Sequence, residues 1–425
     1  MKKLFVVLGA ILFASTFIVG DLFAYTYSHS TGFTRTMARA ATISSPDSVY
    51  YNPVGLVKIK DGLYLDLGNQ AGMKRYEHRI IGAANYHDAT PSFTIPNLSL
   101  SYKNGKGAIF LAVCIPAGGG TVNYKKNMGI ITSSLSGFLP SRFPPAQKIK
   151  ATNFWIQGSV GGAFALTEWL AVTAGMKYSM FSYEVSMGYN GFGTAYKSKT
   201  SANGFSGFGG IMITPMEKIN FTVLYSSMVI ARGKKTDLKL HYSEIAEERL
   251  PDYLLLGLNF KPNDAIEIQA QYQMNFSGQR NYGSTSTQQI GTLSVLRDFV
   301  YGGYSYDAVA GTITTKLGGN VQDYKKRLQH KVGLGLESKV HEMLILSCGV
   351  SYESQESYPA AQNPLDPDLK NIGVGIGGKL IVNEQLTLEL AGARYFYITD
   401  HTRFGLIKMN KSVTSFGLGL TAKLM

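Results

Sequence analysis

The chain lacks the long apolar runs with which helical proteins cross a membrane. After the N-terminus, none of its 425 residues belongs to a continuous apolar segment of about 18 residues, the length expected of a spanning helix. The mean hydropathy of −0.01 is also too low for that class, although 12% of the residues are aromatic. A helical membrane protein is therefore excluded. The same values suit a barrel, whose strands turn one face to lipid and the other to a lumen.

Cysteine is scarce as well. The two cysteines of the sequence, Cys114 and Cys348, lie in segments far apart. Cys114 shares a face with Phe110 and Ala112, whereas Cys348 shares the apolar face of its own segment, so one side chain should point inward and the other outward. A disulfide needs Cα atoms within about 7 Å of each other. We therefore expect two free cysteines.

Signatures of catalysis and of cofactor binding are missing. The sequence contains no Gly-x-Ser-x-Gly and no His-Glu-x-x-His motif, and its seven histidines are scattered without ligand spacing. The glycine-rich run 373–378 has the spacing of a nucleotide-binding loop, but it lies in an alternating segment with no helix after it. We expect no enzyme activity, no cofactor and no metal.

The net charge of +13 at pH 7 raises nucleic acid as a partner. Neither a basic helix nor a nucleic-acid motif is present, so we expect no such partner. The basic residues gather in predicted loops, as Lys74, Arg75 and Arg79; Lys148 and Lys150; Arg232, Lys234 and Lys235; and Lys325, Lys326 and Arg327. Two interpretations remain open: ordinary solvated charges, or steering of anionic amphiphiles and lipid head groups.

The clearest positive signal is alternation within residues 264–277. The apolar residues Ile266, Ile268, Ala270, Tyr272, Met274 and Phe276 alternate with Glu267, Gln269, Gln271, Gln273 and Asn275. A period of two indicates a strand, and the run is long enough for a tilted membrane crossing of about 9–11 residues. We predict that the glutamines face a lumen and that their apolar neighbours face lipid.

Comparable segments recur along the chain. About fourteen of them lie near 61–71, 97–103, 107–116, 151–166, 169–187, 195–214, 219–232, 251–261, 264–277, 328–339, 343–354, 371–382, 384–397 and 412–424. Short turns alternate with longer connections, of which 117–150 and 278–327 are the longest. Within the second, residues 290–301 suit either a loop helix or an extra hairpin. The pattern predicts an all-β membrane protein with an antiparallel transmembrane β-barrel of about 14 strands, closed so that no edge meets lipid.

The residues before the barrel divide into two parts. Residues 1–24, a basic start followed by an apolar run, predict a secretory signal peptide, with a membrane anchor as the alternative. Residues 25–60 combine small residues with capping signals and Pro46 at a first helical position, which predicts short helical turns. This stretch is too short for a domain, so we expect it to pack as a plug in the lumen of a barrel spanning 61–425. Export and barrel together indicate the outer membrane of a diderm bacterium.

The plug region resembles a known family. Asn52-Pro53, with Gly32, Arg39 and Asp47 upstream, is similar to the N-terminal hatch of the FadL family of outer-membrane transporters. The family signature is an Asn-Pro-Ala triplet followed shortly by Leu, and here Val54 replaces the alanine. The segment 250–258, which runs from Leu-Pro to Gly-Leu, matches a second family feature. The resemblance spans most of the chain.

The resemblance implies passive uptake of hydrophobic molecules, typically long-chain fatty acids. Ligand would land on an apolar patch between extracellular loops, move to an interior pocket, and leave sideways beside a kinked third strand. Asn52, Pro53, Val54 and Pro116 are the implied hatch and gating residues, and we expect Asn52 to hydrogen-bond the barrel wall. The sequence around Pro116 suits either a kink or a strand end. Besides ligand and membrane lipid we expect no partner, and a monomer.

Two sets of residues are candidates for ligand capture. Loop 117–150 carries an apolar face at helical spacing, made of Ile131, Leu135, Phe138 and Leu139 and followed by Phe143. A carboxylate would be bound by Lys148, Arg232, Lys234 and Lys235, if these face the loop cavity. The alternatives to a lipid transporter are a plugged or narrow porin for polar solutes and a surface adhesin that acts through its long loops.

Glycines form rows along the predicted lumen face. They are Gly333 and Gly335; Gly373, Gly375 and Gly377; and Gly417 and Gly419. Glycine weakens a strand, so a row of glycines indicates that another backbone approaches closely. We predict that this backbone is the plug.

Overall fold

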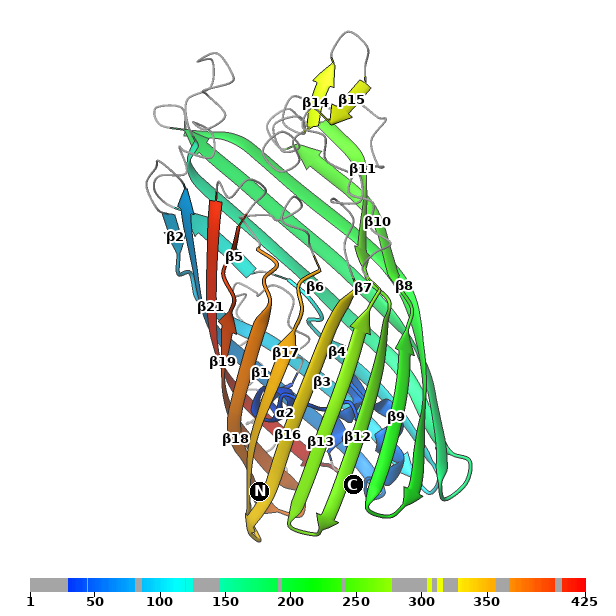
Figure 1. The fold of residues 1–425 in the computed structure, drawn as a ribbon. Helices are drawn as coiled ribbons and strands as arrows, with labels where there is room; N and C mark the ends of the chain where they lie inside the picture. Colours follow the sequence, from blue (N-terminus) through cyan, green and yellow to red (C-terminus); the bar gives the residue numbers. More distant parts are fainter. Residues whose placement is uncertain are drawn as a thin grey trace.

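A closed β-barrel surrounds a small helical plug (Figure 1). This computed structural model describes residues 30–43, 45–80, 86–118, 120–124, 146–189, 193–237, 242–276, 304–307, 312–315, 328–356, 367–401 and 407–425. The predicted signal peptide, residues 1–24, lies outside these ranges. So do residues 290–301, which were expected to form a loop helix or an extra hairpin. None of the helices in the described ranges is long and apolar enough to cross a membrane.

The helices and strands follow one another along the chain. The plug contains α2 (Thr31–Thr36), η1 (Pro46–Tyr50) and η2 (Pro53–Lys58). The strands are β1 (Gly62–Ile80), β2 (Tyr86–Asp88), β3 (Ser92–Asn104), β4 (Gly107–Cys114), β5 (Gly120–Tyr124), β6 (Ala146–Ala165), β7 (Leu170–Tyr189), β8 (Gly193–Met216), β9 (Ile219–Ser226), β10 (Val229–Asp237), β11 (Tyr242–Leu250), β12 (Tyr253–Asn263), β13 (Ile266–Asn275), β14 (Tyr304–Asp307), β15 (Thr312–Thr315), β16 (Gln329–His341), β17 (Leu344–Glu353), β18 (Asn371–Asn383), β19 (Leu386–Tyr397), β20 (Asp400–His401) and β21 (Ile407–Lys423). Strands β14 and β15 pair only with each other and lie beyond the barrel mouth in Figure 1.

The barrel closes through β1 and β21. These two strands pair from Tyr64 opposite Lys423 to Ile80 opposite Ile407, while the other edge of β1 pairs with β3. Three crossings are built from two segments each: β4 with β5, β9 with β10, and β11 with β12. The short β2 and β20 extend their neighbours. The result is a fourteen-stranded antiparallel barrel, which confirms the fold predicted from the alternation.

The two faces of the wall differ as predicted. In β13, Gln269, Gln271 and Gln273 are buried in the lumen, while the residues between them are partly exposed on the outside. Both cysteines are free, Cys114 buried and Cys348 exposed, also as expected. A strand that faces lipid on one side and a filled lumen on the other must alternate in this way.

Strands β1, β6 and β10 extend beyond the segments predicted for them, of which the first ended at 71, the second began at 151 and the third ended at 232. Strands β6, β7 and β8 have 20, 20 and 24 residues, well beyond the roughly 9–11 that cross a bilayer, and they rise above their neighbours in Figure 1. The placement of three basic clusters in loops was wrong for this reason: one, at 74–79, lies in β1, another, at 148–150, in β6, and the third, at 232–235, in β10. Beyond the membrane both faces of a strand meet water, so the alternation disappears while the backbone pairing continues.

The plug packs against the glycine rows. A Cβ atom at Gly335 would overlap the carbonyl oxygen of Thr36, and one at Gly375 would overlap that of Thr34. The remaining glycines that meet the plug are Gly333 at Met37, Gly377 at Arg35, and Gly417 and Gly419 at Thr31. The predicted approach of a plug backbone is therefore confirmed at Gly333, Gly335 and Gly375, whereas Gly377, Gly417 and Gly419 meet side chains of the plug. Gly373 differs, because a Cβ there would meet the ring of Tyr395 at 2.9 Å.

Candidate functional site

Ion pairs fasten the plug to the barrel wall. Arg35 of α2 pairs with Glu337 of β16 and, at 3.3 Å, with Glu389 of β19. Arg39 reaches the other carboxylate oxygen of Glu337 at 3.2 Å, and Lys379 of β18 lies 3.5 Å from Glu337. All of these side chains are almost fully buried. A buried charge is tolerated when its partners are in place, so the network specifies where the plug sits.

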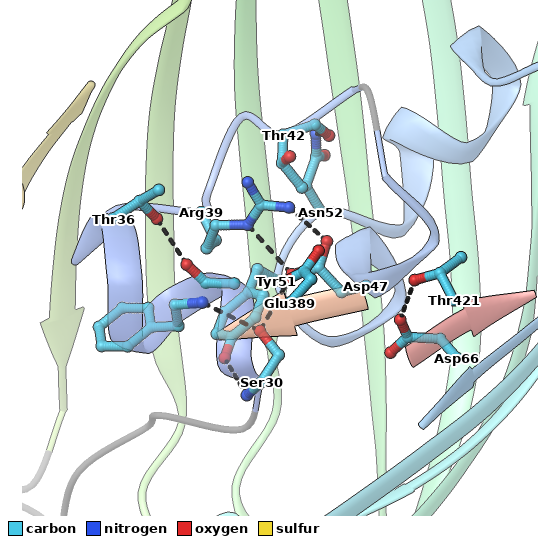
Figure 2. Close-up of polar contacts among 12 residues, drawn as sticks. Ser30, Thr36, Arg39, Thr42, Asp47, Tyr51, Asn52, Asp66, Glu389 and Thr421 are labelled. Atoms are coloured by element: carbon cyan, nitrogen blue, oxygen red, sulfur yellow. Dashed lines mark hydrogen bonds and ion pairs between the residues drawn. The ribbon is translucent and has the colours of Figure 1, made fainter. Parts of the chain in front are cut away.

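Asp47 closes the network inside the plug. It accepts hydrogen bonds from Arg39 Nε at 3.1 Å and from Ser30 Oγ at 3.0 Å, which ties the start of α2 to η1 (Figure 2). Burial by itself would raise the pKa of Asp47, but the positive charges of Arg39, Lys379 and Arg35 and the hydrogen bond from Arg39 together outweigh it and hold this pKa below its ordinary value of 3.8. Asp47 is therefore ionised at neutral pH, and the plug is held by charge-assisted hydrogen bonds.

The predicted hatch residues Asn52, Pro53 and Val54 lie at the start of η2. Asn52 donates from its amide to the carbonyl oxygen of Thr42 at 2.9 Å. The expectation that Asn52 bonds the barrel wall was wrong, because this donor is used inside the plug. Pro53 begins η2, where its missing N–H costs nothing. Val54 is 1% exposed and packs against Ala171 and Met212, so the wall accommodates the larger residue at this position.

The third crossing of the barrel is interrupted in the middle of the wall. Strand β4 ends at Cys114 and β5 begins at Gly120, yet both pair with β6. Between them Ala117 accepts a hydrogen bond from the Trp155 N–H at 2.9 Å. Gly118 adopts φ of 142°, a conformation that other residues rarely take. Of the two readings of this stretch, the kink is the one observed.

The kink separates the third crossing from the second. Strands β3 and β4 pair up to Leu98 opposite Val113, and within the described part of the chain β3 has no ladder partner on that side beyond this pair. At that point Asn97 of β3, which is 2% exposed, donates to the hydroxyl of Tyr50 at 3.2 Å. The plug therefore lies directly against the inner side of the interruption.

A pocket lies between the plug, the kink and the far wall. The plug contributes Val49, Tyr50 and Pro53, and the kink contributes Cys114 and Pro116. The wall adds Phe208, Leu224, Val229, Leu250 and Tyr253 among others. Pro53 and Pro116, both predicted as gating residues, thus face one pocket. Its volume is about 40 Å³, against the roughly 300–1,000 Å³ of small-molecule sites, so a ligand larger than water enters only if the plug or its neighbours shift.

Lys177 of β7 gives this pocket its charge. It is the one charged side chain among the described residues that line the pocket. Its Nζ donates to Ser226 Oγ at 2.9 Å and to the Tyr253 hydroxyl at 3.0 Å. The same atom lies 5.4 Å from the centre of the Phe208 ring and 5.0 Å from that of Tyr253. An ammonium held by hydroxyls and aromatic rings remains able to attract an anionic group.

The predicted capture residues are divided by the structure. The apolar set Ile131, Leu135, Phe138, Leu139 and Phe143 lies outside the described ranges, as does the side chain of Lys148. In β10, Ala231 is buried on the inner face, so Arg232 and Lys234 are on the outer face and Lys235 is on the inner face. Arg232 is exposed and pairs with Glu247 at 3.3 Å. These basic residues therefore do not share one face, and carboxylate binding by them stays a prediction.

Two groups of functional residues were missed from the sequence. The wall residues of the ion-pair network around the plug arginines are Glu337, Glu389 and Lys379. They are charged residues at lumen positions of alternating strands, and that parity was a usable signal. Lys177 occupies the same kind of position in β7. In a polar lumen, however, charge is expected, so parity alone does not show which charged residue meets the plug and which meets a pocket.

Fold and site together define a plugged outer-membrane-type barrel with a kinked third strand. No protein-family model and no curated protein matches the chain. Among solved structures, a Pseudomonas aeruginosa FadL homologue aligns over 96% of this chain and 100% of its own, with a TM-score of 0.68 and 16% identity.

Toluene transporters have the same architecture. TodX of Pseudomonas putida aligns over 95% of this chain and 99% of its own, with a TM-score of 0.63 and 13% identity. TbuX of Ralstonia pickettii aligns over 92% and 97%, with a TM-score of 0.60 and 12% identity. At such identities the likeness establishes the fold. The chain has the barrel fold of the FadL-type proteins, as its sequence resemblance implies.

Proposed function

We propose that the chain is a FadL-family transporter that imports hydrophobic molecules passively through an outer membrane. The observation that carries the proposal is the pocket that joins the plug to the kink of the third strand. An apolar solute gains nothing from a watery axial pore, whereas a side exit delivers it to the bilayer without crossing water. The solved structures of similar fold, a FadL homologue and toluene transporters, support the same class of cargo.

The plug supports a sideways route over an axial one. Its backbone lies against the glycines of the wall, and its arginines are bonded to wall carboxylates. Moving the whole plug would separate buried charges, which costs about 3–5 kcal/mol when one partner is lost. Shifting η2 at Pro53 disturbs none of these ion pairs. We therefore propose that the pocket opens by local movement of the plug while the ion pairs persist.

Within this class, long-chain fatty acid is the cargo we favour. Lys177 places one positive charge in a pocket lined otherwise by apolar and neutral polar side chains. A carboxylate at that point gains charge-assisted hydrogen bonds, and its tail contacts Phe208 and Leu224. The same proposal includes capture of the ligand before it reaches the pocket. The apolar tail would be bound by Ile131, Leu135, Phe138, Leu139 and Phe143, and the carboxylate would be attracted by Lys148, Arg232, Lys234 and Lys235. So do a monomeric state and residence in the outer membrane of a diderm bacterium.

The test compares two cargoes in cells that lack their own fatty-acid porin. Lys177→Met should lower uptake of oleate about tenfold, the loss of one hydrogen bond to a charged group, and leave toluene uptake unchanged. Lys408→Met, at an exposed lysine of β21, is the matched control. An equal loss for both cargoes would overturn the carboxylate role but keep the hydrophobic one. Swelling of reconstituted liposomes in sugars would instead favour the narrow porin and overturn the transport proposal.

A further inference from the structure

The outer surface of the barrel contains a groove that the transport route does not use. It lies across β3, β4, β6 and β7, close to the Asn104–Gly107 turn, and has a volume of about 630 Å³. Its floor is formed by Gly162 and Ala174, which pair with each other across β6 and β7. The exposed side chains of Tyr102, Ile109 and Phe164 stand around the floor. A concave site of this volume lies within the roughly 300–1,000 Å³ typical of small-molecule sites.

The groove arises because small residues replace large ones in one row of the wall. Across the strands, Ile109 is opposite Gly162, Gly162 is opposite Ala174, and Ala174 is opposite Gly209. The next outward row toward the barrel mouth carries Leu111, Val160 and Met176, each more than half exposed. A row of small residues between rows of large ones leaves a depression on an otherwise convex surface.

The position of the groove determines what can cover it. Its walls belong to the apolar outward face, which in a transmembrane barrel meets acyl chains. One end reaches Asn104, and the exposed Lys106 follows in the same short turn. The carbonyl of Lys106 accepts a hydrogen bond from the Ala165 N–H at 2.8 Å, so this turn is fixed beside Phe164. Short turns mark the periplasmic end of such barrels, where phospholipid head groups lie.

We propose that this groove is a binding site for one glycerophospholipid of the periplasmic leaflet. One acyl chain lies along the floor between Ile109 and Phe164, and the phosphate approaches Asn104 and Lys106. A long unbranched chain matches an apolar groove with a polar end, and a phosphate matches an amide and an ammonium. A second barrel is a poorer occupant, because two convex walls would touch at the rims and leave the floor empty. The proposal does not depend on the transported cargo.

If the groove binds a phospholipid, purified protein should retain one lipid molecule, and a substitution in the groove should weaken its binding. Purified, delipidated protein is titrated with palmitoyl-oleoyl phosphatidylethanolamine, and bound lipid is counted by native mass spectrometry. Wild-type protein should retain one lipid. Ala174→Phe fills the floor and should weaken binding about tenfold, the loss of roughly two buried methylene groups. Ala270→Phe is the matched control, an outward-facing alanine of β13 away from the groove.

Two further variants test the same lipid site independently of Ala174→Phe. Should Ala174→Phe not assemble, Ile109→Ala, which removes one wall, should also weaken binding severalfold. Lys106→Gln should weaken the phospholipid but not dioleoylglycerol, which has no phosphate. Equal retention by wild type, Ala174→Phe and Ala270→Phe would overturn the site. So would displacement of the lipid by equimolar oleate, which would assign the groove to the cargo, or a dimer that Ala174→Phe abolishes.

Discussion

The inner surface of the barrel has two unlike walls. On strands β16 to β18, glycines meet the backbone of the plug, as at Gly335 and Gly375. On strands β6 and β7, glycines also point inward, but a Cβ at Gly161 or Gly175 would meet the ring of Phe208. We call the first the plug wall and the second the pocket wall. The same residue type admits a main chain in one place and an aromatic side chain in the other.

The difference between the two walls explains how one lumen can be closed by the plug and still bind a ligand. At the plug wall, backbone contact and buried ion pairs leave the plug one position. At the pocket wall, Phe110 and Phe208 lie 6.1 Å apart between ring centres, beside the kink and Lys177. Aromatic side chains rearrange more readily than a main chain that is held against a wall. We therefore expect plug-wall mutations to change closure, and pocket-wall mutations to change ligand binding.

The largest effect should follow from Arg39→Met. It leaves Asp47 without its guanidinium and removes one partner from Glu337, both of which remain buried. Losing one member of a buried network costs about 3–5 kcal/mol. The plug should detach, and conductance in planar bilayers should rise. Lys234→Met, at an exposed position, should leave conductance as in wild type. Unchanged conductance in Arg39→Met would show that packing alone holds the plug.

The next effect tests the glycines themselves. Gly375→Val places a side chain against the carbonyl of Thr34, and overpacking of this kind costs about 1–3 kcal/mol. Plug residues should become susceptible to protease while the barrel still migrates as a folded species on unheated gels. Gly209→Val is the matched control, since a Cβ at Gly209 meets nothing closer than 3.8 Å. Equal susceptibility in both variants would show that contact with Gly375 does not hold the plug in place.

Acid should loosen the plug less than Arg39→Met does, because Glu337 stays bonded to Arg39. The pKa of Asp47 is below its ordinary value of 3.8, so its stabilisation is present above pH 3.8 and is lost as the pH falls through the depressed value. Conductance should be constant from about pH 8 to pH 5 and rise only in stronger acid. Asp47→Asn should raise it at every pH. A rise near pH 6 would point to a different group.

The smallest effect should come from Asn52→Ala. The variant removes one hydrogen bond to Thr42 inside the plug, worth about 1 kcal/mol, and touches none of the ion pairs. Closure should be unchanged, and any effect should appear in uptake, since η2 and Pro53 border the pocket. Increased conductance without a change in uptake would place Asn52 with the plug wall instead.

Much of the barrel was predictable because lipid and lumen impose a period of two on each strand. The crossings, their number and the lumen placement of Gln269 to Gln273 follow from that period. The full length of some strands did not, because β1 and β6 continue beyond 61–71 and 151–166 by backbone pairing without alternation. The kink at Pro116 was only one of two readings, since proline and glycine suit strand ends and interruptions equally.

The sequence by itself determined the class of fold and the presence of a close backbone contact along the glycine rows. Both are local properties. The environment on each face of a strand, lipid or lumen, selects the residue type at each position, and a glycine lacks a Cβ wherever it stands. Which carboxylate meets Arg35, which carbonyl receives Asn52, and that Pro53, Pro116 and Lys177 line one pocket were decided by the tertiary structure. Barrel closure brings together residues hundreds of positions apart, and a lumen in which many side chains are polar does not mark those that will be neighbours.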